Sequence, residues 1–308
     1  MRDPQVVLNR GVVWSVSRPN LVSALVVFGA ILAAYIPTYI TLAEGPWQTE
    51  QESHGPLIIL AAAWVAWQSR DRLRNVTIAP APIVGWVVLV LGLALMVISR
   101  SQDILAIEVG SQIPVLAGAI LLLFGWGALR VLAFPLAFLV FSVPPPGFII
   151  DALTVPLKAQ ISNWVAEALY RAGYPIAQNG VMIMIGPYQL MVQDACAGLN
   201  SIFALSAIGI LYVYLAGHSL ARNLVLLAAT LPIAVAANVV RVAALVLIAY
   251  YAGVGAIEGA YHELTGIALF AVALVLVMLL DAAIGGALAL IRGAKLVLAK
   301  TRSHSPAP

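Results

Sequence analysis

Eight apolar stretches, each close to the length of a membrane crossing, set the strongest limit on how this chain can fold. A bilayer core about 30 Å thick is crossed by about 20 helical residues. The stretches fall near 21–42, 55–69, 82–99, 112–129, 131–149, 197–216, 223–251 and 263–291. We therefore predict an all-α polytopic membrane protein with about eight transmembrane helices, of which the second is short and the fifth is interrupted by proline.

Composition excludes several other classes of protein. Of the 308 residues, 62% are hydrophobic and 9% are charged, whereas soluble domains carry roughly 25% charged residues. These values exclude a soluble globular fold and a disordered chain. The net charge of +3 is too small to indicate a nucleic-acid partner. The single cysteine, Cys196, excludes an internal disulfide and a thiolate-rich zinc site, and we expect neither a metal nor a cofactor.

The distribution of lysine and arginine predicts the orientation in the membrane, because these residues concentrate in cytoplasmic loops. With a cytoplasmic N-terminus, twelve of the sixteen basic residues fall inside, and only Arg100, Lys158 and Arg171 fall outside. Ten of the thirteen acidic residues, including Glu108, also fall outside. Arg241 belongs to neither side, since it lies within the seventh apolar stretch. Both termini are therefore predicted to be cytoplasmic.

The longest outside segment is 143–195, which we predict to be a periplasmic insertion within a single integral membrane domain over 1–308. Between Asp151 and Ala172, an apolar residue recurs every four positions, which predicts an amphipathic helix lying on the membrane surface. The apolar runs 181–185 and 188–192 are separated by Gly186 and Pro187, a pattern that predicts a short β-hairpin.

Cys196 follows this insertion and opens the sixth span, next to Asp194. A thiol at a helix N-terminus lies at the positive end of the helix dipole, which favours the nucleophilic thiolate. Its small neighbours Ala195, Ala197 and Gly198 leave room for a substrate backbone. The alternative interpretation is a cysteine that packs as a small apolar side chain.

Arg241 is a permanent charge within an apolar stretch, a placement that costs on the order of 3 kcal/mol and indicates a functional site. It lies nineteen residues beyond Arg222, about 28 Å along a helix, and so near the outer boundary at the depth of Cys196. The alternatives are an arginine that reaches the headgroups or pairs with a carboxylate. Asn238 either orients a partner or makes a helix-packing hydrogen bond, and Asp194 either pairs with Arg241 or steers a substrate amide.

His262 precedes the eighth span on the same outer side. Cysteine, histidine and arginine together suit acyl transfer, in which a thiolate attacks a carbonyl, histidine moves the proton and the cation stabilises negative charge. His54, at the outer start of the second span, is a further candidate, although each histidine alone also fits an ordinary interfacial residue. His218 and His304 fall on the cytoplasmic side, and we interpret them as loop residues outside the site.

At these residues the sequence resembles the exosortase/archaeosortase family of membrane transpeptidases. The matching features are Ser53-His54-Gly55, the run Asp194-Ala195-Cys196-Ala197-Gly198-Leu199-Asn200-Ser201, Asn238-Val239-Val240-Arg241 after Leu231-Pro232, and His262 before the last span. Ala197 stands where the common family form has serine, so that hydroxyl is not essential here. The Ser-His-Gly-Pro sequence from Ser53 is similar to the exosortase B branch.

The resemblance implies a membrane-embedded cysteine protease/transpeptidase of the bacterial inner membrane, with its active site facing the periplasm. Its implied partners are proteins with a C-terminal sorting signal of the PEP-CTERM type, which has a Pro-Glu-Pro-like motif, a transmembrane helix and a basic tail. Cleavage would be followed by transfer to an acceptor, usually in bacteria that make exopolysaccharide. The implied catalytic residues are Cys196, Arg241 and His262.

Two other functions remain open from the residues alone. A transporter or polysaccharide-export component would use an intramembrane arginine to bind an anionic substrate. Against it, the sequence has no evident inverted repeat, and its polar residues gather at one face rather than at mid-membrane. A non-catalytic assembly subunit is the second alternative, and it leaves the convergence of Cys196, Arg241 and His262 unexplained.

Overall fold

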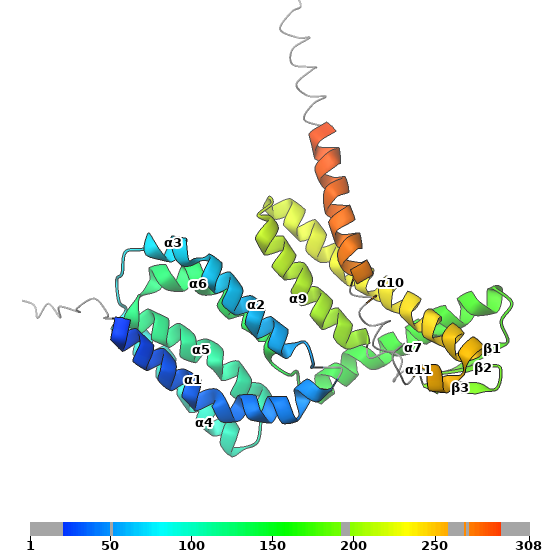
Figure 1. Cartoon of the computed structure of the whole chain (residues 1–308), viewed down its shortest axis with the longest axis horizontal. Coiled ribbons are helices and arrows are strands. Elements are labelled where there is room, and N and C mark those ends of the chain that lie inside the picture. The colour runs from blue at the N-terminus through cyan, green and yellow to red at the C-terminus, as the bar shows by residue number, and fades with distance from the viewer. Residues whose placement is uncertain (1–20, 50–51, 192–197, 258–267, 269–270, 291–308) are drawn as a thin grey trace, which may run out of the picture. The chain divides into compact units, whose positions relative to one another are not determined.

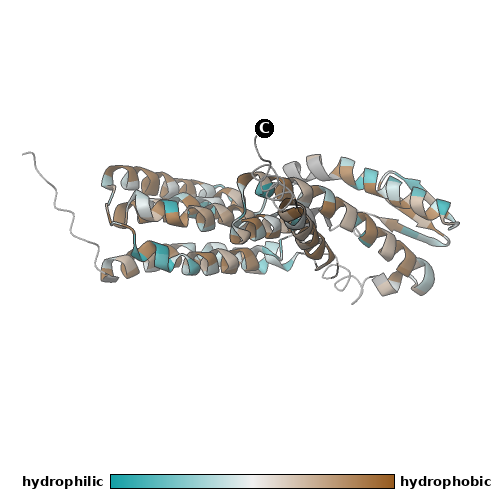
Figure 2. Cartoon of the chain, turned by 90° about the horizontal axis from the view of Figure 1, so that it is seen from above, coloured by the Kyte–Doolittle hydropathy of each residue, from teal (hydrophilic) through white to brown (hydrophobic). Residues whose placement is uncertain are grey.

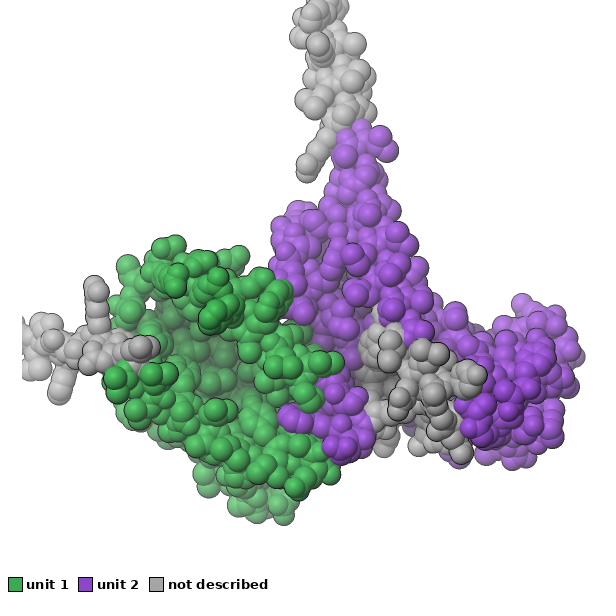
Figure 3. Space-filling model, viewed as in Figure 1, with its two compact units in different colours: residues 1–45, 56–144 green, residues 46–55, 145–308 purple. Residues whose placement is uncertain are grey.

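The computed structural model describes residues 21–49, 52–191, 198–257, 268 and 271–290. The chain divides into two compact units (Figure 3). Unit 1 comprises Met1–Gly45 and Pro56–Pro144, and unit 2 comprises Pro46–Gly55 and Pro145–Pro308. Most residues of the helices in both units are apolar. Hydrophilic residues are more frequent in the part of unit 2 that contains the β-strands (Figure 2).

Unit 1 is built from helices (Figure 1). They are α1 (Leu21–Glu44), α2 (Gly55–Gln68), α3 (Arg70–Arg74), α4 (Pro82–Ser101), α5 (Leu105–Leu123) and α6 (Trp126–Phe138), which continues into a 3₁₀ turn, Leu139–Ser142. Proline at the start of α4 suits the first helical turn, where its missing N–H has no helical partner to lose.

Helices α4 and α5 pack closely because glycines remove side chains from their interface. A Cβ atom at Gly118 would lie 2.5 Å from the backbone nitrogen of Leu89, and one at Gly92 would lie 2.8 Å from that of Val115. Small residues at such contacts let two helix backbones approach in a lipid environment, where apolar side chains gain little from leaving the lipid. Tyr35 of α1 is buried beside this pair.

Unit 1 also holds a partly buried ion pair between two residues that the sequence analysis placed between membrane spans. Arg100 and Glu108, both expected in an outside loop, lie in α4 and α5 and approach to 2.8 Å. The hydroxyl of Thr38 donates to the same Glu108 oxygen at 2.6 Å, and Arg100 also donates to the carbonyl of Ala34. Glu108 is only 8% exposed, so its charge is compensated inside the helical unit rather than by water.

Unit 2 joins a small sheet to long helices. Its elements are a 3₁₀ turn (Pro46–Gln48), α7 (Gly147–Arg171), β1 (Ile176–Asn179), β2 (Met182–Ile185), β3 (Tyr188–Met191), α9 (Gly198–Ala216), α10 (Leu220–Ala252), α11 (Val254–Ile257) and a last helix, Ala271–Leu290. The strands form an antiparallel sheet in the order β1-β2-β3, with Ile176 opposite Ile185 and Ile185 opposite Tyr188.

The sheet contains the predicted hairpin, as β2 and β3, together with a further strand. The two-residue connection Gly186-Pro187 places its glycine at φ +55°, and Gly180, after Asn179, has φ +61°. Glycine tolerates such positive values, which tight hairpin turns require. The Asn179-Gly180 pair was therefore a visible signal for the turn that joins β1 to β2.

Helix α7 is amphipathic as expected, but its apolar stripe is covered by protein, and its predicted place on the membrane surface stays a prediction. Its apolar stripe packs against the sheet and the C-terminal part of α10 in one buried cluster. The buried members of this cluster are Ile161, Val165, Leu169, Ile183, Ile185, Val242 and Val246. The stripe was correctly recognised as apolar, but its period does not say whether lipid or protein covers it.

Among the described residues, five helices are long and apolar enough to cross a membrane, by length and composition. They are Val22–Gln48, Pro82–Ser101, Leu105–Leu123, Leu220–Ala252 and Ala271–Leu290, and three shorter apolar helices are Gly55–Gln68, Trp126–Ser142 and Phe203–Ala216. The polytopic all-α prediction is confirmed. The fourth and fifth apolar stretches were placed several residues too late in the chain, because neither Glu108 nor Gln112 interrupts α5.

Candidate functional site

Helix α10 positions the candidate site. It begins after Ser219, whose extended backbone precedes the first turn, and ends at Gly253, whose φ of +84° suits glycine. Its 33 residues extend about 50 Å, whereas a bilayer core is about 30 Å thick. The end of α10 that carries Val242 and Val246 packs against α7 and the sheet. Arg241 therefore lies where α10 enters this packed layer.

Asn238 and Arg241 lie one helical turn apart on α10, and both side chains are buried. Arg241 is 6% exposed and Asn238 is 0% exposed. A guanidinium cannot shed its charge, so its burial requires polar or charged surroundings. A buried cation is also electrostatically more effective than the same cation in water. The structure thus holds a strong fixed charge at the position that the sequence singled out.

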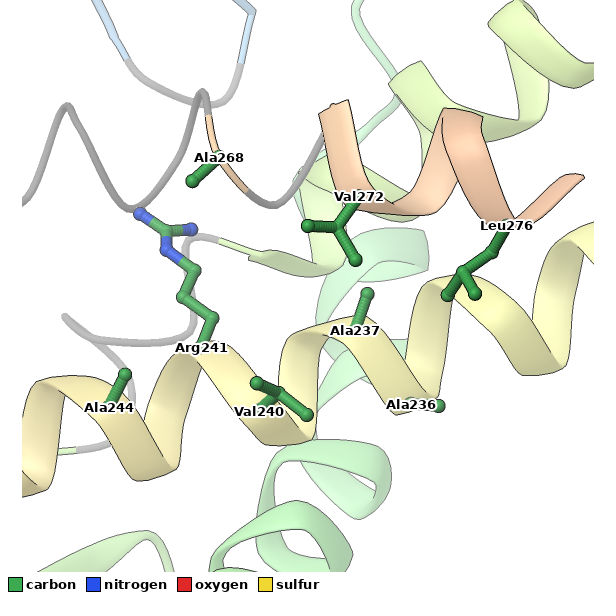
Figure 4. Close-up of a pocket in the computed structure, with 8 residues that line it drawn as sticks. All are labelled: Ala236, Ala237, Val240, Arg241, Ala244, Ala268, Val272 and Leu276. Carbon is green, nitrogen blue, oxygen red and sulfur yellow. The ribbon is translucent and has the colours of Figure 1, made fainter. Parts of the chain in front are cut away.

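Arg241 borders a cavity of about 240 Å³ between one face of α10 and one face of the last helix (Figure 4). The lining residues are Ala236, Ala237, Val240, Arg241, Ala244, Ala268, Val272 and Leu276. Figure 4 shows the guanidinium extending toward the Ala268 end of the cavity. The other seven lining side chains are apolar and four of them are alanine, so the cavity has an apolar wall of mostly small side chains beside one arginine.

His54 occupies a tight turn immediately before α2 and is half-buried. The turn is held by the Gly55 N–H, which donates to the Glu52 carbonyl at 2.9 Å, and a Cβ at Gly55 would overlap the Trp47 indole. Burial raises the pKa of the Glu52 carboxyl from 4.5 to about 7. The segment Pro46–Gly55 belongs to unit 2, the unit that carries Arg241.

Cys196, Asp194 and His262 lie outside the described residues. Their convergence with Arg241 therefore stays a prediction, and so do their chemical roles. The described α9 begins at Gly198, two residues after Cys196. Among the described residues, no group of three histidine, cysteine, aspartate or glutamate side chains is placed to hold a metal ion.

Sequence reasoning missed another buried charged group in unit 2, Asp281, in the last helix. Asp281 is 6% exposed and accepts hydrogen bonds from Tyr212 at 2.8 Å and Arg222 at 2.6 Å, and its carboxylate is 3.0 Å from His218 Nε2. A second Arg222 nitrogen donates to the Asp281 backbone carbonyl at 2.7 Å. His218, interpreted as a loop residue, thus belongs to what we call the Asp281 cluster: Tyr212, His218, Arg222 and Asp281. An acidic residue inside an apolar stretch was the available signal.

Comparison with known families supplies the context for this site. The family model described as Transmembrane exosortase (Exosortase_EpsH) matches residues 47–279. The match begins before His54 and ends within the last helix, so it includes Cys196, Arg241 and His262. No curated protein and no solved structure matches the chain. The matched region covers well over half of the chain, which therefore belongs to the family of transmembrane exosortases.

Proposed function

We propose that this protein is a cysteine-dependent membrane peptidase/transpeptidase that cleaves C-terminal sorting signals of the PEP-CTERM type at the periplasmic face and transfers the protein to an acceptor. The observation that carries the proposal is the burial of Arg241 beside an apolar cavity, within a chain of the exosortase family. A fixed cation in a site from which water is excluded is one of the arrangements by which enzymes stabilise developing negative charge.

In the proposed reaction, the Cys196 thiolate attacks the carbonyl carbon of the scissile peptide bond. Arg241 stabilises the oxyanion, and His262 transfers a proton to the leaving amine as the C–N bond breaks. The acceptor nucleophile then attacks the thioester and regenerates the Cys196 thiol. Arg241 cannot serve as the base, because its guanidinium keeps its proton at all physiological pH values.

We place the active site on the outer side of the bacterial inner membrane, with both termini in the cytoplasm and 143–195 as a periplasmic insertion. The length of α10 supports this arrangement, because Arg222 and the sheet-packed Val246 lie near opposite ends of one helix. We further propose that Asn238, Asp194 and His54 support the catalytic residues or bind substrate. The partners are then membrane-anchored proteins with a basic tail, and neither nucleic acid nor a cofactor is required.

The test is co-expression with a tagged sorting-signal protein, followed by its size shift on gels. Wild type should shorten the substrate, whereas Cys196→Ser, Arg241→Ala and His262→Ala should accumulate the full-length form. Arg171→Ala, at an exposed position on α7, is the matched control for loss of an arginine and should process normally. Normal processing by Cys196→Ser would overturn the thiol mechanism.

A second measurement tests the orientation and separates the enzyme from a transporter. An impermeant thiol reagent added from the periplasmic side should label Cys196, and labelling only from the cytoplasm would overturn the proposed topology. A transport component would show substrate-dependent export that survives Cys196→Ser. Loss of processing in Cys196→Ser, with unchanged amounts of protein in the membrane, would support the enzyme.

A further inference from the structure

The last helix contacts the rest of unit 2 through one narrow stripe. Its buried side chains are Ala273, Val277 and Asp281, which recur every four residues. Gly285 continues the stripe, since a Cβ there would lie 3.1 Å from the Arg222 guanidinium. Neighbouring apolar residues such as Val275 and Leu279 are exposed. The helix is therefore attached along a single line of small or short side chains.

Within this stripe, Asp281 is the residue that makes directional contacts. Ala273 and Val277 can slide against an apolar neighbour at little cost, because lipid is as apolar as the protein surface they leave. The Asp281 carboxylate instead contacts three side chains, one each from α9, the turn that follows it and the first turn of α10. Hydrogen bonds to a charged acceptor are short and angle-dependent, so they fix both the rotation and the axial position of a helix.

The same helix forms one wall of the Arg241 cavity, through Val272 and Leu276. Leu276 lies five residues from Asp281, about 7.5 Å along the helix. Since an α-helix without a kink moves as a rigid body over this distance, a rotation at Asp281 carries Leu276 and Val272 with it. The last helix is thus one rigid element that both carries Asp281 and lines the Arg241 cavity.

We propose that Asp281 is a positioning residue: held by Tyr212, His218 and Arg222, it sets the rotation of the last helix and thereby the wall of the cavity that faces Arg241. The effect on catalysis rests on the proposed function, whereas the effect on helix position does not. Asp281 lies in the last helix and contacts Arg222 near the start of α10, whereas the sheet packs near the other end of α10.

Cross-linking tests the helix position independently of activity. Cys196 is the single cysteine, so Cys196→Ser gives a cysteine-free background. New cysteines at Ala237 and Ala273, which share one buried cluster, should then be joined by an oxidant or a short bifunctional reagent in membranes. We expect a high yield with Asp281 intact, a partial loss in Asp281→Asn, which keeps one acceptor oxygen, and at least a threefold loss in Asp281→Ala, equivalent to about 0.6 kcal/mol.

Two adjacent glycines provide a matched pair that leaves all charges in place. Gly285→Leu inserts a side chain against the Arg222 guanidinium, whereas a Cβ at Gly286 has no atom within 4 Å. Both changes replace helical glycine by leucine, so their intrinsic effects on helix formation are equal. We expect Gly285→Leu to reduce the cross-link as Asp281→Ala does, and Gly286→Leu to retain it.

A control separates positioning from general destabilisation. Glu108→Ala removes the other described buried carboxylate with an arginine partner, in unit 1, and should lower thermal stability while retaining the Ala237–Ala273 cross-link. Unchanged cross-linking in both Asp281→Ala and Gly285→Leu would overturn the proposal. In the Cys196-containing protein, processing should fall in these two variants and persist in Gly286→Leu. Absence of processing in the wild type would instead refute the proposed function and leave the cross-linking result standing.

Discussion

Asn238 and Arg241 lie three residues apart on α10, and both side chains are buried on a helix whose C-terminal part packs against the sheet. In an apolar helix, two buried polar side chains one turn apart indicate that the face they share points away from the lipid. That face also carries Ala237 and Ala244, which line the cavity. The helix therefore presents its cation to the protein interior.

Arginine geometry should matter as much as its charge at position 241. Arg241→Lys keeps a positive charge but removes the planar set of five donors. We expect processing of a sorting-signal protein to fall by about 100-fold, the scale measured when one oxyanion donor is lost, in both Arg241→Lys and Arg241→Met. The rate of size shift after pulse labelling measures this. Processing by Arg241→Lys near the wild-type rate would mean that a point charge suffices.

The Arg100–Glu108 pair should stabilise unit 1. Glu108→Gln leaves the Arg100 guanidinium without its carboxylate, and we expect the free energy of unfolding to fall by about 1–3 kcal/mol, less than for a fully buried pair because Arg100 is partly exposed. Unfolding in mild detergent measures the change. Glu167→Gln breaks the exposed Arg171 pair, which has the same 2.8 Å separation, and should cost at most about 0.5 kcal/mol. Equal losses in the two variants would contradict the role of burial.

Close packing of α4 and α5 should make Gly118 intolerant of even a methyl group. Gly118→Ala places a Cβ against the Leu89 backbone, and we expect a loss of about 1–3 kcal/mol from overpacking. Gly110→Ala, in the same helix, meets its nearest atom at 3.9 Å and should be neutral or stabilising by up to about 1 kcal/mol. Detergent unfolding midpoints compare the two, and similar destabilisation by both would argue against backbone contact as the cause.

Much of this fold could be predicted from hydropathy alone, because apolar stretches near 20 residues have few alternatives to membrane helices. Hydropathy alone could not predict whether lipid or protein covers each apolar face. Ile161 and Val165 repeat at the helical period whether lipid or a sheet covers them, and only the packed structure places them against Ile183 and Val242.

The buried charged residues could likewise be predicted only in part from the sequence. Arg241 could be recognised because it interrupts a long apolar run that contains no other charge. Glu108 and Arg100 lie close to a span boundary, where a loop is the simpler interpretation. Asp281 was visible as an acid in an apolar stretch, but its donors come from residues about 60 to 70 positions earlier, and no local pattern reports that pairing.

Stability of the fold around the Glu52–Gly55 turn should depend on pH through Glu52. Burial raises the pKa of this carboxyl to about 7 in the folded protein, so the folded state binds its proton more tightly than the unfolded state, where the pKa is 4.5. Stability should therefore be highest below about pH 4.5, fall as the pH rises through about 7, and level off above that.

Glu52→Gln should remove this dependence and raise the melting temperature at pH 8 relative to the wild type. The measurement is the difference in melting temperature between pH 5 and pH 8. Glu44→Gln, which replaces an exposed carboxylate of the same region, is the control and should retain the wild-type difference. A Glu52→Gln protein with the full wild-type difference would contradict the assignment to Glu52.

The continuity of α10 has a mechanical consequence for Arg241. Near its start, α10 is held to the last helix through Arg222, and it contacts that helix again around Ala237, the contact nearer the sheet. A tilt of about 5° about that point would move Tyr250, at the sheet, by about 2 Å, but Arg241, four residues away, by only about 0.5 Å. In such a tilt the backbone at Arg241 would thus move only about a quarter as far as the backbone at the sheet.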